Sequence, residues 1–135
     1  MVRMRSRPGR SILIVDDDVD IRETISLILE DEGYAVASAA NGEEALRYLR
    51  SHPSPSLILL DLMMPGMDGV EFRAEQQRDA QLSGIPVIVV TASGNARERA
   101  RAMQVDGMIQ KPIALDALLE TIERCTADVR SGQLS

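Results

Sequence analysis

The sequence is poor in cysteine, histidine and aromatic residues. It has one cysteine, one histidine and no tryptophan, and aromatic residues make up 2% of its 135 residues. Because Cys125 has no second cysteine to pair with, an internal disulfide is excluded. Cys125 falls on the apolar stripe of a predicted helix, so we interpret it as a core residue. His52 lies in a connection rich in proline and serine, residues 51–56, which predicts a surface position.

The chain also lacks a long hydrophobic run. Its longest apolar runs, such as residues 57–60, are far shorter than the roughly 20 residues that span a bilayer. The apolar stretch that follows the first ten residues, 12–15, is too short for the core of a signal peptide. We therefore expect no transmembrane segment, no secretion signal and a cytoplasmic protein.

Basic residues outside the N-terminus are outnumbered by acidic ones. The net charge is −6, yet the four charged residues of positions 1–10 are all arginines, which leaves −10 for the rest of the chain. So acidic a body binds nucleic acid poorly, and direct DNA binding is not expected. We interpret residues 1–10 as a flexible, solvated basic tail.

What the sequence does contain is an alternation of apolar runs with segments of helical periodicity. The continuous runs are typical of parallel strands that are buried on both faces of a sheet. They are residues 12–15, 57–60, 87–90 and the weaker 108–109, with 34–37 as a fifth candidate. The helical segments between and after them are residues 21–29, 41–49, 69–78, 96–103 and 115–122.

This alternation predicts an α/β protein of (βα)5 architecture. Successive parallel strands are joined by right-handed crossovers, which place helices on both faces of a doubly wound parallel sheet. A chain of 135 residues that is 44% hydrophobic suffices for one core, so we expect one domain, at residues 11–127. The apolar pattern stops after about residue 127, and we expect residues 128–135 to form a polar tail.

Acidic, hydroxyl or basic side chains follow four of the five predicted strands. They are Asp16 and Asp17 after the first strand, Asp61 after the third, Thr91 after the fourth and Lys111 after the fifth. In open parallel sheets, ligands bind outside the carboxyl ends of the strands. We therefore expect these side chains to converge on one pocket.

The carboxylates of this pocket indicate a divalent cation. Carboxylates within about 4 Å repel each other by roughly 4 kcal/mol at an effective dielectric constant of about 20, so they need a cation or raised pKa values. Oxygen ligands from few residues suit Mg²⁺ better than a dedicated Ca²⁺ cage. A simpler alternative is that the acids of residues 16–20 cap the next helix, which is our interpretation of Asp18 and Asp20. An EF-hand is excluded because Ile21 stands where its loop needs glycine.

Lys111 is the only lysine among 15 basic residues. Its place at a strand end, directly before Pro112, favours contact with a phosphoryl oxygen over an ordinary surface role. The hydroxyl of Thr91, at the end of the strand next along the chain from Asp61, favours a phosphate-binding role as well.

Four motifs together resemble the receiver domain of response regulators in two-component signalling. They are Ile12-Leu-Ile-Val-Asp-Asp17, Asp61-Leu-Met-Met-Pro-Gly-Met-Asp-Gly69, Val90-Thr-Ala92 and Lys111-Pro112. Each motif is weak alone, but four in this order form a specific signal. The resemblance covers about residues 11–127 and implies a stand-alone, flavodoxin-like receiver with strand order 2-1-3-4-5.

The resemblance implies a role for each residue at the strand ends. The phosphoacceptor would be Asp61, and the phosphoryl group would be bound by Thr91 and Lys111. Mg²⁺ would be held by Asp16, Asp17, Asp61 and the backbone carbonyl of Met63. A cis peptide bond between Lys111 and Pro112 is implied as well.

The implied phosphodonor is a phosphohistidine on a sensor histidine kinase or a histidine phosphotransfer protein. The only histidine of this chain, His52, is a predicted surface residue, so the donor belongs to another protein. The chain would catalyse only its own phosphorylation and dephosphorylation, and is not expected to be an enzyme for other substrates. It would pass its signal to a downstream protein.

The chain departs from the family pattern at Met108. Receivers usually carry an aromatic residue three positions before the lysine, and that ring moves inward when the threonine engages phosphate. Methionine can repack in such a cavity but has neither ring nor hydroxyl, so we expect Met108 to shift less on phosphorylation than an aromatic residue would. We expect the response in the loop after Thr91 and in residues 96–103, whose apolar stripe is thin. Met63 and Ser93 are the side chains best placed to guide or exclude the hydrolytic water.

Three alternatives remain at this point. An aspartate-dependent phosphatase of the haloacid dehalogenase type would use Asp16 and Asp18, but the chain is too short for a cap domain and has no acidic pair after Lys111. A pseudo-receiver would dock partners without phosphorylation, which the full set of site residues disfavours. The chain could also be one piece of a longer regulator.

Overall fold

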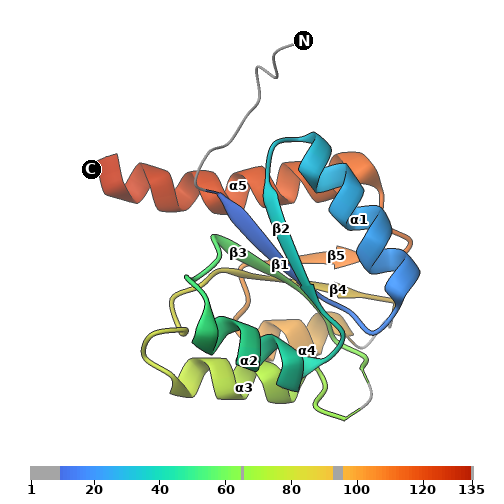
Figure 1. Ribbon diagram of the computed structural model, residues 1–135, viewed down its shortest axis with the longest axis vertical. Coiled ribbons are helices and arrows are strands. Elements are labelled where there is room, and N and C mark those ends of the chain that lie inside the picture. Colours follow the sequence, from blue (N-terminus) through green and yellow to red (C-terminus); the bar gives the residue numbers. More distant parts are fainter. Residues whose placement is uncertain (1–9, 65, 93–95, 135) are drawn as a thin grey trace.

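The computed structural model describes residues 10–64, 66–92 and 96–134, over which strand and helix alternate (Figure 1). The elements are β1 (Ser11–Val15), α1 (Val19–Asp31), β2 (Ala35–Ala39), α2 (Gly42–Ser51), β3 (Leu57–Asp61), α3 (Gly69–Arg78), β4 (Val87–Thr91), α4 (Ala96–Ala102), β5 (Gly107–Gln110) and α5 (Leu115–Leu134). The predicted (βα)5 pattern is therefore confirmed. The arginines of the predicted tail before Arg10 lie outside the described residues.

The five strands form one parallel sheet in the order β2-β1-β3-β4-β5, as the resemblance implies. The register aligns the strand ends: Val15, the last residue of β1, pairs with Leu60 of β3, and Asp61 pairs with Val90 of β4. The chain winds outward from β1 to β2 and then crosses back to β3, so the strand order reverses between β1 and β3. Ligand sites of open parallel sheets form at such a reversal.

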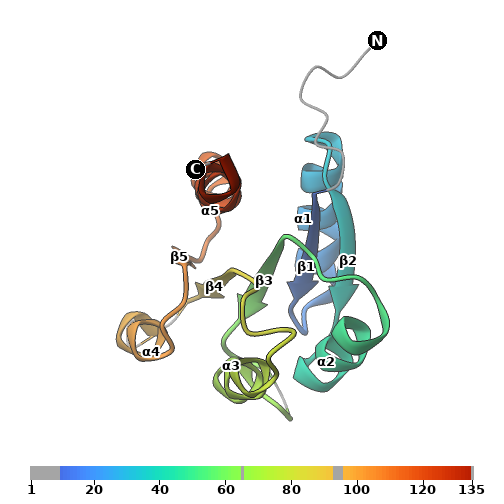
Figure 2. The same ribbon diagram turned by 90° about the vertical axis from the view of Figure 1, so that its left-hand side faces the viewer.

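Helices cover both faces of the sheet, α1 and α5 on one and α2, α3 and α4 on the other (Figure 2). The side chains of β1 alternate between the two layers. Ile12 and Ile14 pack with the α1 and α5 side, while Leu13 and Val15 pack with the α2, α3 and α4 side. Because both faces of β1, β3 and β4 are covered, these strands need continuous apolar runs. The same packing buries Cys125, as expected.

Two elements differ from the sequence prediction. The second strand starts at Ala35, one residue after its predicted start, because Tyr34 packs into the core beside α1 and its amide donates to the carbonyl of Leu29. The last helix, predicted over residues 115–122, continues as α5 to Leu134. The expected tail from residue 128 is therefore helical up to that point. Helical backbone hydrogen bonds are local and do not need an apolar stripe to continue.

Side-chain caps fix where the helices next to the strand ends begin. Asp18 is the N-cap of α1, where its side chain accepts from the amides of Asp20 and Ile21. Asp68 forms a capping box with Glu71 at the start of α3. The predicted capping role of Asp18 is thus confirmed. Within the described part of the chain, no helix combines the length and apolar character needed to cross a membrane.

A close approach of α3 to the end of β3 gives a first prediction. A Cβ atom on Gly69 would lie 2.8 Å from the backbone oxygen of Asp61 and 2.9 Å from the Cα atom of Leu62. Gly69→Ala should therefore lower the free energy of unfolding by about 1–3 kcal/mol through forced backbone displacement. Urea unfolding followed by circular dichroism measures this loss.

Gly84→Ala is the matched control, because a Cβ atom there meets nothing within 4 Å. It should change the unfolding free energy by less than about 1 kcal/mol. Equal losses in the two variants would show that the contact between α3 and β3 is not the cause.

Candidate functional site

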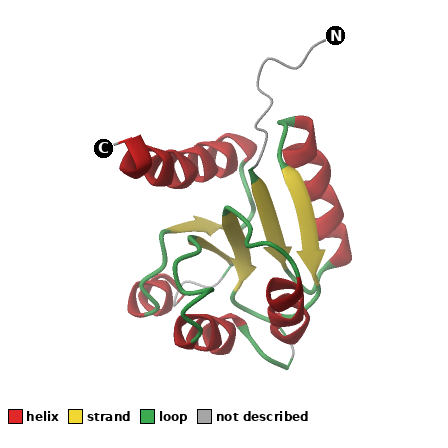
Figure 3. Cartoon of the chain, turned by 60° about the vertical axis from the view of Figure 1, so that its left-hand side comes forward, coloured by secondary structure: helices red, strands yellow, loops and turns green. Residues whose placement is uncertain are grey.

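The ends of four strands bring the predicted site residues to the carboxyl edge of the sheet. Figure 3 shows the strands in yellow, with arrowheads at this edge. Asp61 and Thr91 are the last residues of β3 and β4, Asp16 directly follows β1, and Lys111 directly follows β5. Because β3 lies between β1 and β4, Asp61 is at the centre of this edge.

Three carboxylates gather there. One oxygen each of Asp16, Asp17 and Asp61 lies within 4.8 Å of the others. Asp16 and Asp61 are only 3% and 4% exposed, whereas Asp17 faces solvent. The cluster predicted from the sequence is therefore present, with two buried carboxylates and one that is exposed to solvent.

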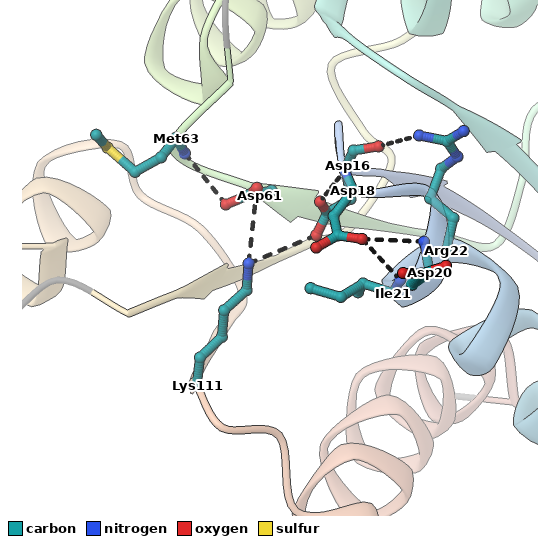
Figure 4. Close-up of polar contacts among 8 residues, drawn as sticks. All are labelled: Asp16, Asp18, Asp20, Ile21, Arg22, Asp61, Met63 and Lys111. Atoms are coloured by element: carbon teal, nitrogen blue, oxygen red, sulfur yellow. Dashed lines mark hydrogen bonds and ion pairs between the residues drawn. The ribbon is translucent and has the colours of Figure 1, made fainter.

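Lys111 reaches between the two buried carboxylates (Figure 4). Its Nζ atom lies 3.6 Å from Asp16 Oδ2 and 3.7 Å from Asp61 Oδ2. The Lys111 amide donates to the carbonyl of Thr91 at 2.8 Å, which ties the end of β5 to the end of β4. The peptide bond from Lys111 to Pro112 is cis, as the resemblance implies.

The carboxyl group of Asp61 is held from both sides. The Met63 amide donates to Oδ1 at 3.1 Å, while Oδ2 faces Lys111. The pKa of Asp61 is raised from 3.8 to about 6, mainly by burial. The hydrogen bond from Met63 and the charge of Lys111 lower this pKa, whereas the negative charges of Asp16 and Asp17 raise it further. Burial thus outweighs the attraction of Lys111, and the ionised carboxylate needs further positive charge.

The donor set fits Mg²⁺. All three groups of the cluster offer oxygen atoms, the ligands that Mg²⁺ prefers. The three oxygens lie within 4.8 Å of one another, so modest side-chain adjustments would let all three contact one ion. Three carboxylates against one ammonium also leave negative charge for a divalent cation to neutralise.

The sequence interpretation missed the part that Arg22 plays. Its Nη1 atom donates to the backbone carbonyl of Asp16 at 2.7 Å, while the Asp18 amide donates to Asp16 Oδ1 at 2.9 Å. These two contacts fix the turn between β1 and α1. Nothing in the sequence distinguishes Arg22, which is half-buried, from the exposed arginines of the helices.

The remaining predicted site residues are placed as follows. Thr91 is 1% exposed, on the strand next to Asp61. The Met63 side chain points away from Asp61 and is 59% exposed (Figure 4). Met108 pairs in register with Val89 and packs against the α2, α3 and α4 side of the core. Ser93 lies outside the described residues.

The sequence of this chain is similar to those of known proteins. The response regulator receiver domain model matches residues 12–123. Response regulator Rre1 of Synechocystis sp. is 39% identical over 111 residues, which cover 80% of this chain and 48% of that protein. The phosphate regulon transcriptional regulatory protein PhoB of Escherichia coli is 35% identical over 117 residues, 85% of this chain and 51% of that protein. The chain spans about half the length of the curated relatives it matches.

Solved structures share the fold along most of the chain. The Vibrio cholerae chemotaxis protein CheY4 superposes with a TM-score of 0.79 at 32% identity, over 86% of this chain and 98% of that one. The response regulator protein TrrA of Thermotoga maritima, solved in complex with Mg²⁺ and BeF, gives a TM-score of 0.77 at 33% identity, with the same two coverages.

The raised pKa of Asp61 makes stability depend on pH. Because the folded pKa of about 6 lies above the unfolded value of 3.8, the cost of holding the ionised carboxylate in the fold is absent below about pH 4 and complete above about pH 6. Asp61→Asn removes this cost. Without metal, the variant should therefore exceed the parent in unfolding free energy by on the order of 1–3 kcal/mol at pH 8, and by less at pH 5.

Urea unfolding in EDTA at several values between about pH 5 and pH 8 measures this difference. Added Mg²⁺ should reduce it at pH 8, because the ion binds the folded parent and not the variant. A difference that stays constant over this range would show that the Asp61 carboxyl is not the titrating group.

Proposed function

The chain belongs to the family of response regulator receiver domains, and from this membership we propose that it accepts a phosphoryl group from a phosphohistidine protein onto Asp61. One observation carries the proposal. The Asp61 carboxyl is buried at the end of the central strand β3, between the Lys111 ammonium and the acidic pair Asp16 and Asp17. A receiver needs a nucleophilic carboxylate with cations on the side from which phosphate arrives; Lys111 would be one such cation, and a metal ion bound by the acidic pair would be the other.

In the proposed transfer, an oxygen of the Asp61 carboxylate forms a bond to phosphorus while the bond from phosphorus to the donor imidazole nitrogen breaks. The electron pair of the broken bond stays on that nitrogen. The hydrogen bond from the Met63 amide to Oδ1 fixes the orientation of the carboxylate, and Lys111 holds a positive charge 3.7 Å from Oδ2. Such positioning supplies much of the catalysis.

The other site residues bind the phosphoryl group and Mg²⁺. The metal ligands would be Asp16, Asp17, Asp61 and the backbone carbonyl of Met63. Bound Mg²⁺ would neutralise charge on the phosphoryl oxygens and align them for in-line transfer. Lys111, which now contacts two carboxylates, would turn one of these contacts to a phosphoryl oxygen. The Thr91 hydroxyl would bind a second phosphoryl oxygen. The expected role of Met108 in the conformational response stays a prediction.

The donor is proposed to be a sensor histidine kinase or a histidine phosphotransfer protein. His52 is exposed and stacks on Tyr48, with ring centroids 4.1 Å apart, just before β3 and so at the opposite edge of the sheet from Asp61. It is therefore a poor internal donor. Residues 11–127 would form the receiver unit, and the protein would lie in the cytoplasm. It would act on a downstream protein and catalyse only its own phosphorylation and dephosphorylation.

The two rival functions lack a supporting observation. In the dehalogenase-type phosphatase, Asp16 would be the nucleophile and Asp18 its partner, yet Asp18 is occupied as the N-cap of α1. A pseudo-receiver would not need the paired contacts of Lys111 with Asp16 and Asp61. The receiver function accounts for all of these contacts.

Loss of the acceptor carboxylate tests the proposal. Wild-type protein incubated with Mg²⁺ and acetyl phosphate should gain an acid-labile, hydroxylamine-labile phosphoryl group, measured as added mass. Asp61→Asn should remain folded and gain none, because an amide cannot attack phosphorus. Label that persists in this variant would remove Asp61 as the acceptor.

Asp17→Ala and Asp20→Ala form a matched pair for the metal. Asp17 belongs to the oxygen cluster, so its loss should weaken Mg²⁺ binding by roughly tenfold or more and slow phosphorylation. Asp20 only donates its amide to the Asp18 cap, so its replacement should leave both nearly unchanged. Calorimetric Mg²⁺ titration measures the binding, and equal losses in the two variants would contradict the assignment of the cluster.

Met63 should affect the lifetime of the phosphoaspartate. Its exposed thioether cannot orient water well, so we expect a moderately long-lived phosphoprotein. In Met63→Asn the amide can hydrogen-bond the attacking water, and a bond worth about 1 kcal/mol speeds decay by roughly fivefold. Mg²⁺ affinity should not change. Leu27→Asn, a change at an exposed residue of α1, is the control and should leave the decay rate unaltered.

A further inference from the structure

A buried arginine lies on the layer opposite α1 and α5. Arg73 is on α3 and is 6% exposed, although arginine is rarely buried unless it is paired. Burial lowers its pKa, and the nearby charge of Asp106 raises it. The proposed phosphotransfer chemistry makes no use of this residue.

The guanidinium of Arg73 binds the turn that follows α4. Its Nε atom donates to the carbonyl of Met103 at 3.2 Å, and Nη2 donates to that of Gln104 at 2.8 Å. Gln104 has a left-handed backbone with a φ of 55°, as is usual directly after a helix. A cation at this place also complements the negative end of the helix dipole. We call Arg73, Met103 and Gln104 the α4 clamp.

The clamp is anchored by a second buried polar residue of α3. Arg73 Nη1 donates to Gln76 Oε1 at 2.8 Å, and Gln76, which is fully buried, donates through Nε2 to the carbonyls of Leu82 and Ile85. These contacts orient the guanidinium and tie the clamp to the segment that leads into β4. A lysine in place of Arg73 could not make these contacts together, because its ammonium is not a planar fork of donors.

The same turn is also fastened to the sheet. The Asp106 amide donates to the carbonyl of Val87, and Asp106 Oδ2 accepts from the Val87 amide, both at 2.8 Å. The end of α4 nearest β5 is thus bound to α3 and to β4. Ala100 and Met103 are the buried apolar side chains near this end of the helix, which has only 7 residues.

We propose that the α4 clamp makes the C-terminal end of α4 a fixed pivot, so that phosphorylation of Asp61 alters α4 from its N-terminal end. This inference rests on the proposed receiver function. The segment after Thr91 leads directly into the N-terminal end of α4, which is the end nearer the site in the chain. A change that begins there should therefore decline along the helix and stop at Met103. Arg73 is a positioning residue in this response and takes no part in the chemistry.

Hydrogen exchange of backbone amides, read by mass spectrometry, tests the clamp in the full chain. Without any phosphoryl analogue, Arg73→Leu should speed exchange in residues 103–106 by about tenfold or more, because two carbonyl contacts of the turn are lost. Arg78→Leu is the control on the same helix. Its side chain is 73% exposed and pairs only with Glu75, so exchange in this turn should not change.

The response to Mg²⁺ and beryllofluoride, an analogue of the phosphoryl group, tests the pivot. In the wild-type protein, exchange should change in residues 96–100 and stay within about twofold in residues 103–106. In Arg73→Leu the change should spread into residues 103–106. Arg73→Lys, which keeps the charge without the fork, should lie between the two and serves if the leucine variant does not fold.

The outcomes separate this inference from the proposed function. A wild-type protein that does not respond anywhere to beryllofluoride contradicts the receiver function, while the exchange without analogue still tests the clamp. A wild-type protein that responds equally at both ends of α4 keeps the receiver function and overturns the pivot. Unchanged exchange of residues 103–106 in Arg73→Leu overturns the clamp itself.

Discussion

One lysine ammonium holds together a site that its carboxylates would otherwise push apart. Lys111 Nζ lies 3.6 Å from Asp16 Oδ2 and 3.7 Å from Asp61 Oδ2, and each attraction is on the order of 4 kcal/mol at an effective dielectric constant of about 20. The sheet imposes the crowding, because β1 and β3 are neighbours and the two aspartates lie where these strands end. Since a third carboxylate, Asp17, joins them, one ammonium cannot balance the charge.

This imbalance links the stability of the fold to its ligands. Burial raises the pKa of Asp61 to about 6, so near neutral pH the ionised carboxylate is held at a cost that Lys111 reduces but does not remove. Any cation that binds the folded cluster relieves this cost and stabilises the protein. The carboxylates that weaken the fold are thus the same ones that would make its stability respond to a bound cation.

The sequence predicts the sheet and the site well because both depend on patterns that recur in parallel α/β proteins. Continuous apolar runs mark β1, β3 and β4, whose faces are both covered, and acidic or hydroxyl side chains at their ends mark the carboxyl edge. The length of α5 was missed because helical backbone can outlast the apolar stripe. The buried Arg73 and Gln76 were missed because polar side chains on a helix usually face solvent, and because they bind backbone carbonyls of segments outside α3.

Lys111, which is half-buried, and Arg73, which is buried, differ in what they bind, and this decides how each can respond. The partners of Lys111 are carboxylates, and in the proposed transfer Asp61 would change charge and shape, so the Lys111 contacts would have to change as well. Arg73 binds the carbonyls of Met103 and Gln104, which neither titrate nor take up phosphate. The pKa of Asp61 therefore affects the first set of contacts and not the second. A flexible ammonium suits the contacts that must change, and a rigid guanidinium suits those that must persist.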